Sequence, residues 1–345
     1  MFQIEKITET IEKQTNPEPF SGVVYLTSGE EVTYQQGFGY AIHSERIPNQ
    51  INTRFQMASG CKIFTSVAIC QLVEQGKLAF DSLLRDCVDF NFPNYAPEIS
   101  IQHLLTHSSG IRSYFEEDIN PDYEALWQDL PQYKVRGPKD FLPLFQNKAM
   151  KFSPGGQFEY NDGGYILLGL VIESVSDLRF GEFIQNNVFD RAGMQDSGYF
   201  ATDQLPERTA YAYIQNTDGT WRTNFFAVPI VGAPDGGAYT TAPDMFRFWK
   251  ALNDKTLLNA DLTELLLSSQ ITTSLEVPHS YYGFGVWIDQ TNVRVRKFFV
   301  EGYDPGVALR SGFYPKDGKV LTVIGNTADA LWSLYPQLEE LLGLK

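Results

Sequence analysis

Strand-like segments lie at both ends of this sequence, whereas the middle is mostly helical. Near the N-terminus, two β-rich runs flank Ser28-Gly29-Glu30, a pattern that predicts a hairpin. Four further strands are predicted at residues 281–289, 293–300, 306–315 and 319–327, the last two joined by a Lys-Asp-Gly turn. The simplest assembly is one antiparallel sheet that both ends of the chain build together.

The sequence therefore predicts an α+β fold, an α/β sandwich domain with an antiparallel sheet and an inserted helical domain. We expect the sheet and its flanking helices from residues 1–75 and 235–345, and a mainly helical insertion from residues 76–234, within a single unit. The spacing of Phe2, Ile4, Ile7 and Ile11 predicts an amphipathic first helix. Further helices are predicted at residues 101–106, 122–129, 138–147, 164–176, 180–188, 241–253 and 328–343.

The composition excludes several classes of partner. The chain has 345 residues, with 42 acidic and 27 basic side chains and a formal charge of −15. Such an acidic chain is unsuited to nucleic acid or to an anionic membrane surface. The first residues lack the apolar region of a signal peptide, and no apolar run approaches the length of a membrane span, so we expect a cytoplasmic protein. The three cysteines, Cys61, Cys70 and Cys87, suit a reducing compartment.

Several common enzyme signatures are missing from the sequence. It contains no G-x-S-x-G, no H-E-x-x-H, no phosphate-binding loop and no dinucleotide-binding fingerprint, so we expect no cofactor. His103 and His107 are four residues apart and would share one face of a helix, which leaves a metal enzyme as an alternative. Without a nearby Glu to complete a known metal motif, local hydrogen bonding is the favoured interpretation of both histidines, and no metal is expected.

One S-x-x-K motif, Ser59-Gly60-Cys61-Lys62, opens the most apolar helix of the sequence. This helix, at residues 59–75, is apolar on nearly every side, which predicts a buried central helix that ends at Gly76. Residues three apart lie on one face of a helix, so the Lys62 ammonium can reach the Ser59 hydroxyl. A serine becomes a good nucleophile when a neighbouring base takes its proton. Lysine can act as that base if burial lowers its pKa.

A second motif, SPGGQFEYNDGGY, lies at residues 153–165. With the first motif, it resembles the serine β-lactamase and penicillin-binding-protein family, and most closely the esterase-like and class C β-lactamase-like members. Two further stretches resemble the family, HLLTHSSGI at 103–111 and Gly236-Gly237 followed by Thr241 and Asp244. The resemblance covers about residues 20 to 330 and implies a β-lactamase/transpeptidase-like fold.

The resemblance also implies the roles of individual residues. Ser59 is expected to be the acyl-accepting nucleophile and Lys62 its base, and Tyr160 is expected to relay the proton and activate the deacylating water. A tyrosine suits this role if a cation such as Lys62 favours its phenolate. By analogy, the backbone N–H groups of Ser59 and Tyr303 form the oxyanion hole.

Two departures from the family pattern bear on the substrate. Asp162 replaces the Asn of the Tyr-x-Asn motif, and aligning Gly302 with the third motif places Val300 where the family has Lys or His. That Lys or His helps to hold a substrate carboxylate, which Val300 cannot do. We therefore list Asp162, Val300, Glu301, Gly302 and Tyr303 as candidate substrate-binding residues. The hypothesis is that the protein is neither an efficient β-lactamase nor a D-Ala carboxypeptidase.

An uncharged ester or amide fits this site better than a carboxylate-bearing substrate. A sharper hypothesis is a substrate with a free amine, held by Asp162 or Glu301. An arginine from elsewhere, such as Arg310 or Arg112, is the alternative that would restore affinity for a carboxylate.

The sequence thus predicts a serine hydrolase that acts through an acyl-enzyme on a small molecule or peptide. The alternative is a catalytically idle penicillin-binding-protein-like protein that uses the same cleft to bind a ligand. The aromatic-rich stretch from Ser113 to Tyr133 is a candidate lid, with a docked structural loop as the alternative. The substrate's identity and the oligomeric state are left open.

Overall fold

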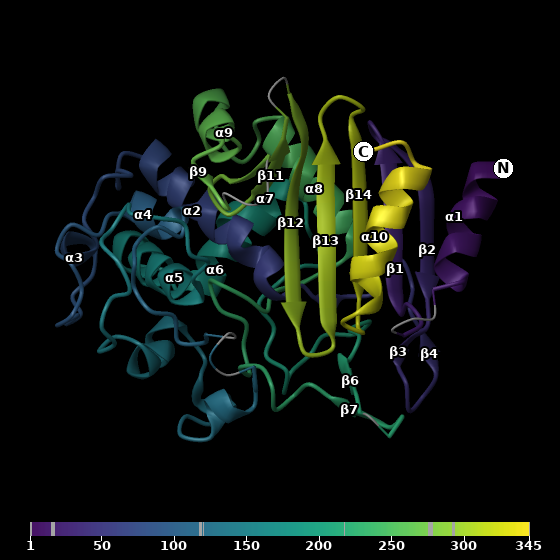
Figure 1. The fold of residues 1–345 in the computed structure, drawn as a ribbon, viewed down its shortest axis with the longest axis horizontal. Coiled ribbons are helices and arrows are strands. Elements are labelled where there is room, and N and C mark those ends of the chain that lie inside the picture. The colour runs from purple at the N-terminus through teal and green to yellow at the C-terminus, as the bar shows by residue number, and fades with distance from the viewer. Residues whose placement is uncertain are drawn as a thin grey trace.

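One antiparallel sheet of eight strands forms the centre of the protein, as Figure 1 shows face-on. The computed structural model describes residues 2–14, 18–116, 119, 121–216, 218–274, 279–291 and 294–344. The strand order is β2-β1-β14-β13-β12-β11-β10-β9, so strands from both ends of the chain lie side by side. The strands are β1 (Gly22–Ser28), β2 (Glu31–Phe38), β9 (Ile271–Thr272), β10 (Ser280–Tyr282), β11 (Trp287–Gln290), β12 (Val295–Asp304), β13 (Val307–Tyr314) and β14 (Lys319–Gly325). The predicted α+β fold with an antiparallel sheet is confirmed.

The pairing of β1 with β14 joins the two ends of the chain. Their register runs from Gly22 opposite Gly325 to Ser28 opposite Lys319. Both neighbouring hairpins turn at a glycine with positive φ, Gly29 between β1 and β2 and Gly318 between β13 and β14. A residue without Cβ adopts this left-handed conformation at no steric cost, which explains why both predicted turns form.

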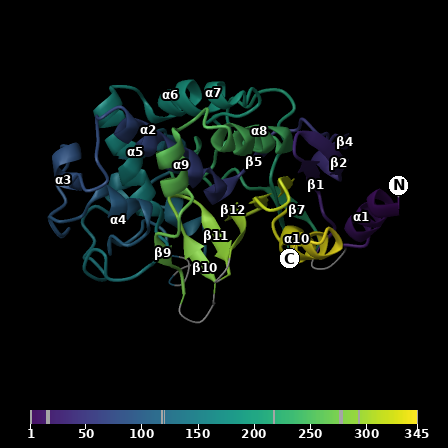
Figure 2. The ribbon, with the colours of Figure 1, turned by 90° about the horizontal axis from the view of Figure 1, so that it is seen from above.

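Each face of the sheet is covered by helices, because alternate side chains of a strand point to opposite faces. Val24 and Leu26 of β1 pack in a core with α1 (Phe2–Glu12) and α10 (Ala330–Leu341). Val23 and Tyr25 belong to the larger core on the other face, with α2 (Lys62–Glu74) and α8 (Ala242–Asn253). Figure 2 shows α1 and α10 together on one side of the sheet and α8 on the other.

Helix α2 is buried along most of its length. Its residues from Lys62 to Leu72 are all buried, which explains why the sequence shows no one-sided apolar stripe. It packs against α5 (Asp162–Ser176), the other long apolar helix. It ends as predicted, because Gly76 follows the helix with φ of +68°.

The remaining elements are short. Thr241 caps α8, at the start of the helix predicted at 241–253, by accepting a hydrogen bond from the backbone N–H of Asp244. The other helices are α3 (Leu84–Cys87), α4 (Ile101–Leu105), α6 (Phe180–Ile184), α7 (Asp190–Ala192) and α9 (Ala260–Leu266). The other strands are β3 (Tyr40–Ile42), β4 (Ile47–Pro48), β5 (Phe55–Gln56), β6 (Tyr213–Gln215), β7 (Trp221–Thr223) and β8 (Tyr239–Thr240).

Three predicted elements differ in type from those that the structure shows. The segment 281–289 is a hairpin of β10 and β11 rather than one strand, because Gly283 and Gly285 allow a tight turn between them. The helix predicted at 138–147 is a 3-10 helix, Pro138–Leu144, because Pro143 inside it cannot donate an α-helical hydrogen bond. The helix predicted at 122–129 is only a 3-10 turn, Ala125–Trp127. The division into a sheet part and a helical insertion with the stated boundaries stays a prediction.

Candidate active site

Ser59 lies on a 3-10 turn, Ala58–Cys61, that connects strand β5 to helix α2. The backbone N–H of Gly60 donates to the carbonyl of Met57, which closes this turn. Ala58, directly before the serine, has a φ of +43°, a left-handed conformation that costs a residue with Cβ about 1 kcal/mol or more. The tight turn presents the half-buried Ser59 side chain to two neighbouring hollows.

Lys62 lies one helical turn after Ser59, and its ammonium has three hydrogen-bond partners. Nζ donates to Ser59 Oγ at 3.0 Å, to Asp162 Oδ1 at 2.6 Å and to the carbonyl oxygen of Asp235 at 2.6 Å. The predicted approach of Lys62 to Ser59 is therefore present. The side chain is 1% exposed, so these bonds form away from water.

The condition under which Lys62 would be the resting base, a lowered pKa, is not met. Burial lowers the pKa of Lys62, as the sequence suggested, but the negative charge of Asp162 and the other acidic groups outweighs burial and holds this pKa well above its ordinary value. The resting lysine is therefore a cation that donates a hydrogen bond to Ser59. It stabilises a serine alkoxide but has no lone pair with which to take the serine proton.

The second motif brings Tyr160 and Asp162 to the same site. Asp162 is the first residue of α5, and the helix is capped by the side chain of Asn161. Lys62 Nζ lies 4.8 Å from the centre of the Tyr160 ring, and that ring stacks on Trp287 of β11 with 6.0 Å between the ring centres. Burial raises the pKa of Tyr160, and the positive charge of Lys62 opposes this rise without cancelling it. The resting tyrosine is therefore protonated.

The end of strand β12 forms the third wall of the site. A Cβ built on Gly302 would lie 2.9 Å from the backbone nitrogen of Ser59 and 2.2 Å from the carbonyl oxygen of Met57. Only glycine therefore lets β12 approach the nucleophile's backbone this closely. Tyr303 follows Gly302 and lines both hollows.

The remaining candidate substrate-binding residues behave differently. Val300 is 2% exposed and belongs to the core, so it lines neither hollow. Glu301 lines the open hollow, but Arg310 on the paired strand β13 donates to its carboxylate through Nε at 2.9 Å and also through Nη2. Arg112, the other arginine considered for a substrate carboxylate, forms an ion pair with Glu116 at 3.0 Å. Both arginines are therefore already paired with acidic residues.

The two histidines make separate local contacts. His103 Nδ1 accepts a hydrogen bond from the backbone N–H of Ser100, and His107 Nδ1 accepts one from the backbone N–H of Asn161. Burial lowers the pKa of His107 well below its ordinary value, so this ring is neutral and holds the segment between Tyr160 and Asp162 in place. Within the described parts of the chain, no three His, Cys, Asp or Glu residues are arranged to hold a metal ion.

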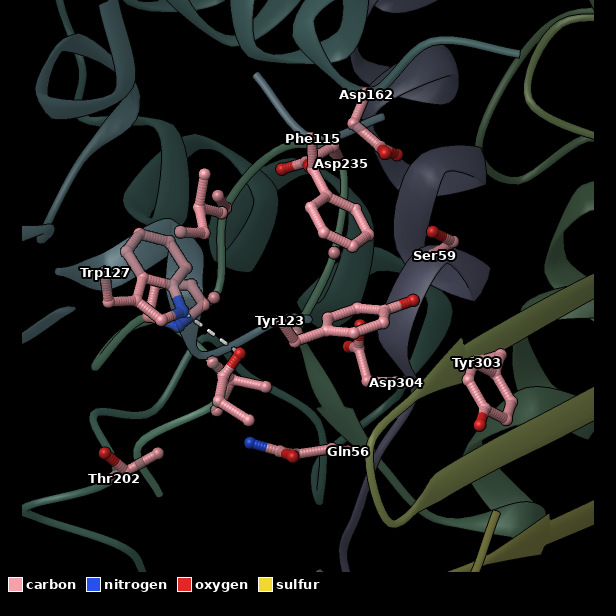
Figure 3. A pocket seen from close by; sticks show the side chains of 18 of the residues that line it. Gln56, Ser59, Phe115, Tyr123, Trp127, Asp162, Thr202, Asp235, Tyr303 and Asp304 are labelled. Carbon is pink, nitrogen blue, oxygen red and sulfur yellow. Dashed lines mark hydrogen bonds between the residues drawn. The ribbon is translucent and has the colours of Figure 1, made fainter. Parts of the chain in front are cut away.

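Ser59 separates two hollows of different character. One is an enclosed cavity of about 90 Å³, and the other is an open groove of about 670 Å³. Figure 3 shows the enclosed cavity between the segment that carries Phe115, Tyr123 and Trp127 and the segment that carries Asp235. The Trp127 indole N–H donates to the carbonyl of Ala227 at 3.1 Å, which ties these two segments together. The site can therefore place the two parts of a substrate on either side of Ser59.

The proposed lid contributes side chains to the cavity. Phe115, Tyr123 and Trp127 all come from the stretch Ser113 to Tyr133. Residues 117, 118 and 120 of this stretch lie outside the described residues. Whether this stretch closes over a substrate stays a prediction.

Sequence reasoning missed Asp235 and Tyr114. Asp235 directly precedes the Gly236-Gly237 pair that was recognised, and it is 3% exposed. The Tyr114 hydroxyl donates a hydrogen bond to its Oδ2. An aspartate beside two glycines in a turn is common at surfaces, so only the fold reveals that this one is buried next to Ser59.

Comparisons with known proteins agree with the site's motifs. The family described as Beta-lactamase matches residues 12–333. Penicillin-binding protein 4* of Bacillus subtilis is 27% identical over 322 residues, which cover 89% of this chain and 68% of that protein. The crystal structure of a penicillin binding protein from Bacillus halodurans is 47% identical, with a TM-score of 0.91 over 97% of this chain and 99% of that one. The octameric penicillin-binding protein homologue from Pyrococcus abyssi is 26% identical, with a TM-score of 0.85 over 99% of this chain and 77% of that one.

The helices described here include none that is both long and apolar enough to cross a membrane.

Proposed function

Because this chain belongs to the β-lactamase family, we propose that it is a serine hydrolase that forms an acyl-enzyme on Ser59. The substrate is an ester or amide of a small molecule or peptide. The observation that carries this proposal is the contact between Ser59 Oγ and the buried Lys62 ammonium, at 3.0 Å. A cation at this distance favours the negative charge that develops on the serine oxygen as it attacks.

Asp162 is the proposed acceptor of the proton that leaves Ser59. Lys62 is protonated at rest, and its Nζ lies 2.6 Å from Asp162 Oδ1. When the substrate displaces water, Lys62 passes a proton to Asp162 and then takes the proton of the Ser59 hydroxyl as Oγ bonds to the acyl carbon. The lysine is again a cation, Asp162 holds one proton, and the oxyanion carries the negative charge. Proton transfer of this kind contributes about 100- to 10,000-fold in rate.

The reaction also requires that the oxyanion be stabilised and that the leaving group receive a proton. The backbone N–H groups of Ser59 and Tyr303 are the proposed oxyanion donors, supported by the close approach of Gly302 to Ser59. Tyr160, protonated at rest beside Lys62, is the proposed donor of a proton to the leaving group. Its phenolate then draws a proton from the water that attacks the acyl-enzyme, which returns Tyr160 to its resting state. As the bond between Ser59 Oγ and the acyl carbon breaks, Lys62 gives Oγ a proton and takes one back from Asp162, which restores both residues.

We further propose that β-lactams are poor substrates. Val300 brings no charge to the site, and Asp162 adds a carboxylate where the family has an amide. The basic residue that lines the open groove, Lys151, is already paired with Glu116 at 3.0 Å and with Glu159. Among the described residues of the groove, a carboxylate-bearing substrate therefore meets acidic side chains and a lysine that is already paired.

A second candidate function is ligand binding without catalysis. It is favoured by one observation, that both Lys62 and Tyr160 are protonated in the resting site, so neither is ready to act as a base.

One experiment separates the two functions. The protein and its Ser59→Ala variant are mixed with p-nitrophenyl acetate, and nitrophenol release is followed from the first milliseconds. A burst followed by turnover that depends on Ser59 is expected for the hydrolase. Release that is the same with and without Ser59 would favour the ligand-binding function.

A further inference from the structure

The cavity beside Ser59 is lined both by apolar side chains and by carboxylates. Aromatic and aliphatic side chains make up most of its wall, including Phe115, Trp127 and Phe200. Three carboxylates also line it, from Asp162, Asp235 and Asp304, and none of its lining residues is a lysine, arginine or histidine. Its volume of about 90 Å³ is room for roughly six to nine water-sized groups, the size of one amino-acid side chain.

The carboxylate of Asp235 is the buried charge in this wall. The Tyr114 hydroxyl donates to Oδ2, and burial and the charge of Asp235 keep the pKa of Tyr114 well above its ordinary value, so the hydroxyl stays a donor. Among the residues that the structure describes, no basic side-chain nitrogen lies within 4.0 Å of this carboxylate. Asp162 differs in this respect, because Lys62 lies 2.6 Å from it.

Burial raises the pKa of Asp235 to about 6, and the positive charge of Lys62 limits the rise. The carboxylate is therefore mostly ionised at neutral pH, buried in the wall of a cavity that several aromatic side chains line. An ionised group in such a place is costly unless a counter-charge reaches it. A cationic ligand would supply that charge.

Asp235 is also close to the nucleophile. A Cβ built on the next residue, Gly236, would lie 3.9 Å from the backbone nitrogen of Ser59. Lys62 Nζ bonds both to Ser59 Oγ and to the backbone carbonyl of Asp235. The backbone of Asp235 is thus anchored beside Ser59, and both residues line the same cavity.

A metal ion is a poorer match for these acids. The described residues include no group of three potential ligands close enough together to hold one. The aromatic rings around the carboxylates instead suit an organic cation, which gains from both the negative charge and the ring faces.

We propose that the enclosed cavity is the acyl subsite of the enzyme, and that it takes an aromatic or bulky apolar acyl group carrying a protonated amine that pairs with Asp235. This inference rests on the proposed function and names its substrate class. The earlier hypothesis placed the amine on Asp162 or Glu301, but those carboxylates already bind Lys62 and Arg310. The amine-binding residue is instead Asp235, with Asp304 adding negative charge to the same wall.

The test compares acyl groups that differ only in charge. The probes are phenylalanine p-nitroanilide with a free amine, in both enantiomers, and the same compounds acetylated on nitrogen. We expect kcat/KM for one free-amine enantiomer to exceed that of its acetylated form by at least about tenfold, the gain typical of a hydrogen bond to a charged group. In Asp235→Asn the ratio falls towards one, because the amide keeps the shape of the side chain without its charge.

A matched variant controls for a general effect of losing an acidic side chain. Asp317→Asn makes the same change in the exposed turn between β13 and β14, at the end of the sheet opposite the β12–β13 turn (Figure 1). It should keep the wild-type ratio. Equal rates for free and acetylated amines in the wild type, or a ratio that survives in Asp235→Asn, would overturn the proposal.

A binding measurement separates this proposal from the proposed function. Calorimetry with phenethylamine and with 3-phenylpropionate, which carry the same ring and opposite charges, requires no catalysis. We expect the amine to bind the wild type at least about tenfold more tightly than Asp235→Asn, and the carboxylate to bind neither well. Amine binding without any Ser59-dependent nitrophenol release would contradict the hydrolase function and support the cation-binding subsite. Ester turnover without preference for the amine would do the reverse.

Discussion

Replacing Asp235 by asparagine should make the empty protein more stable at neutral pH. Burial raises the pKa of this carboxyl from 3.8 to about 6. Each unit of pKa difference corresponds to about 1.4 kcal/mol, so ionised Asp235 costs the fold about 3 kcal/mol at pH 7. Asparagine removes that cost and can still accept the Tyr114 hydrogen bond through its carbonyl oxygen. For a chain of 345 residues, this gain raises Tm by roughly 4 °C.

The stability that Asp235→Asn gains over the wild type must decrease as the pH falls. Between about pH 6 and pH 3.8 the folded wild type holds a proton on Asp235 that the unfolded chain has released. Wild-type stability therefore improves as the pH falls through 6, relative to the variant, and the difference between them vanishes near pH 4. The dependence is opposite to that of an aspartate in a salt bridge, whose pKa is lowered by folding.

The assay is thermal and denaturant unfolding of the wild type, Asp235→Asn and Asp317→Asn at pH 7, 6, 5 and 4. The exposed Asp317→Asn should stay within about 0.5 kcal/mol of the wild type at each pH. A destabilised Asp235→Asn, or a gain that is the same at pH 7 and pH 4, would refute the reasoning. The first result would mean that the carboxylate is already compensated within the fold, and the second that the gain does not come from its ionisation.

Three further predictions concern the reaction itself. Asp162→Asn removes both the proposed proton acceptor and the charge that does most to raise the pKa of Lys62. We therefore expect ester acylation to fall about 100-fold or more where Lys62 is still a cation, and to recover as rising pH makes it neutral. A stopped-flow acylation rate equal to that of the wild type at every pH would contradict this. Gly302→Ala puts a Cβ 2.9 Å from the Ser59 nitrogen, so acylation should fall about 100- to 1000-fold, and an unchanged burst rate would argue against the oxyanion hole. Benzylpenicillin should be hydrolysed far more slowly than p-nitrophenyl acetate when both are followed by absorbance, and comparable rates would refute the substrate hypothesis.

The larger elements could be predicted because their signals are local. The β-rich composition of β1 and β2 and the glycine in the turn between them are visible within a few residues of sequence. The sequence of helix α2 likewise predicts its burial, because the helix is apolar on nearly every side. The predictions failed where one residue overrides the local pattern, as Pro143 does in a segment with helical composition and as Gly285 does between β10 and β11.

In the candidate site, too, local contacts could be predicted and long-range contacts could not. Ser59 and Lys62 are three residues apart, so their contact follows from helical geometry alone. The resemblance assigned Asp162 to the site as a substrate-binding residue, but its contact with Lys62 and the effect of that contact on the lysine's charge were not predicted. The role of Asp235 escaped the sequence entirely, because its burial depends on segments such as the one that carries Tyr114, more than a hundred residues away.

The sequence by itself therefore determined the family, the antiparallel sheet built from both ends and the spacing of the nucleophile and its lysine. Only the tertiary structure decided which groups are charged and which are within reach of a substrate. The physical reason is that helical and strand periodicity depends on neighbours along the chain, whereas the pKa of a buried group depends on distances in space and on how completely water is excluded.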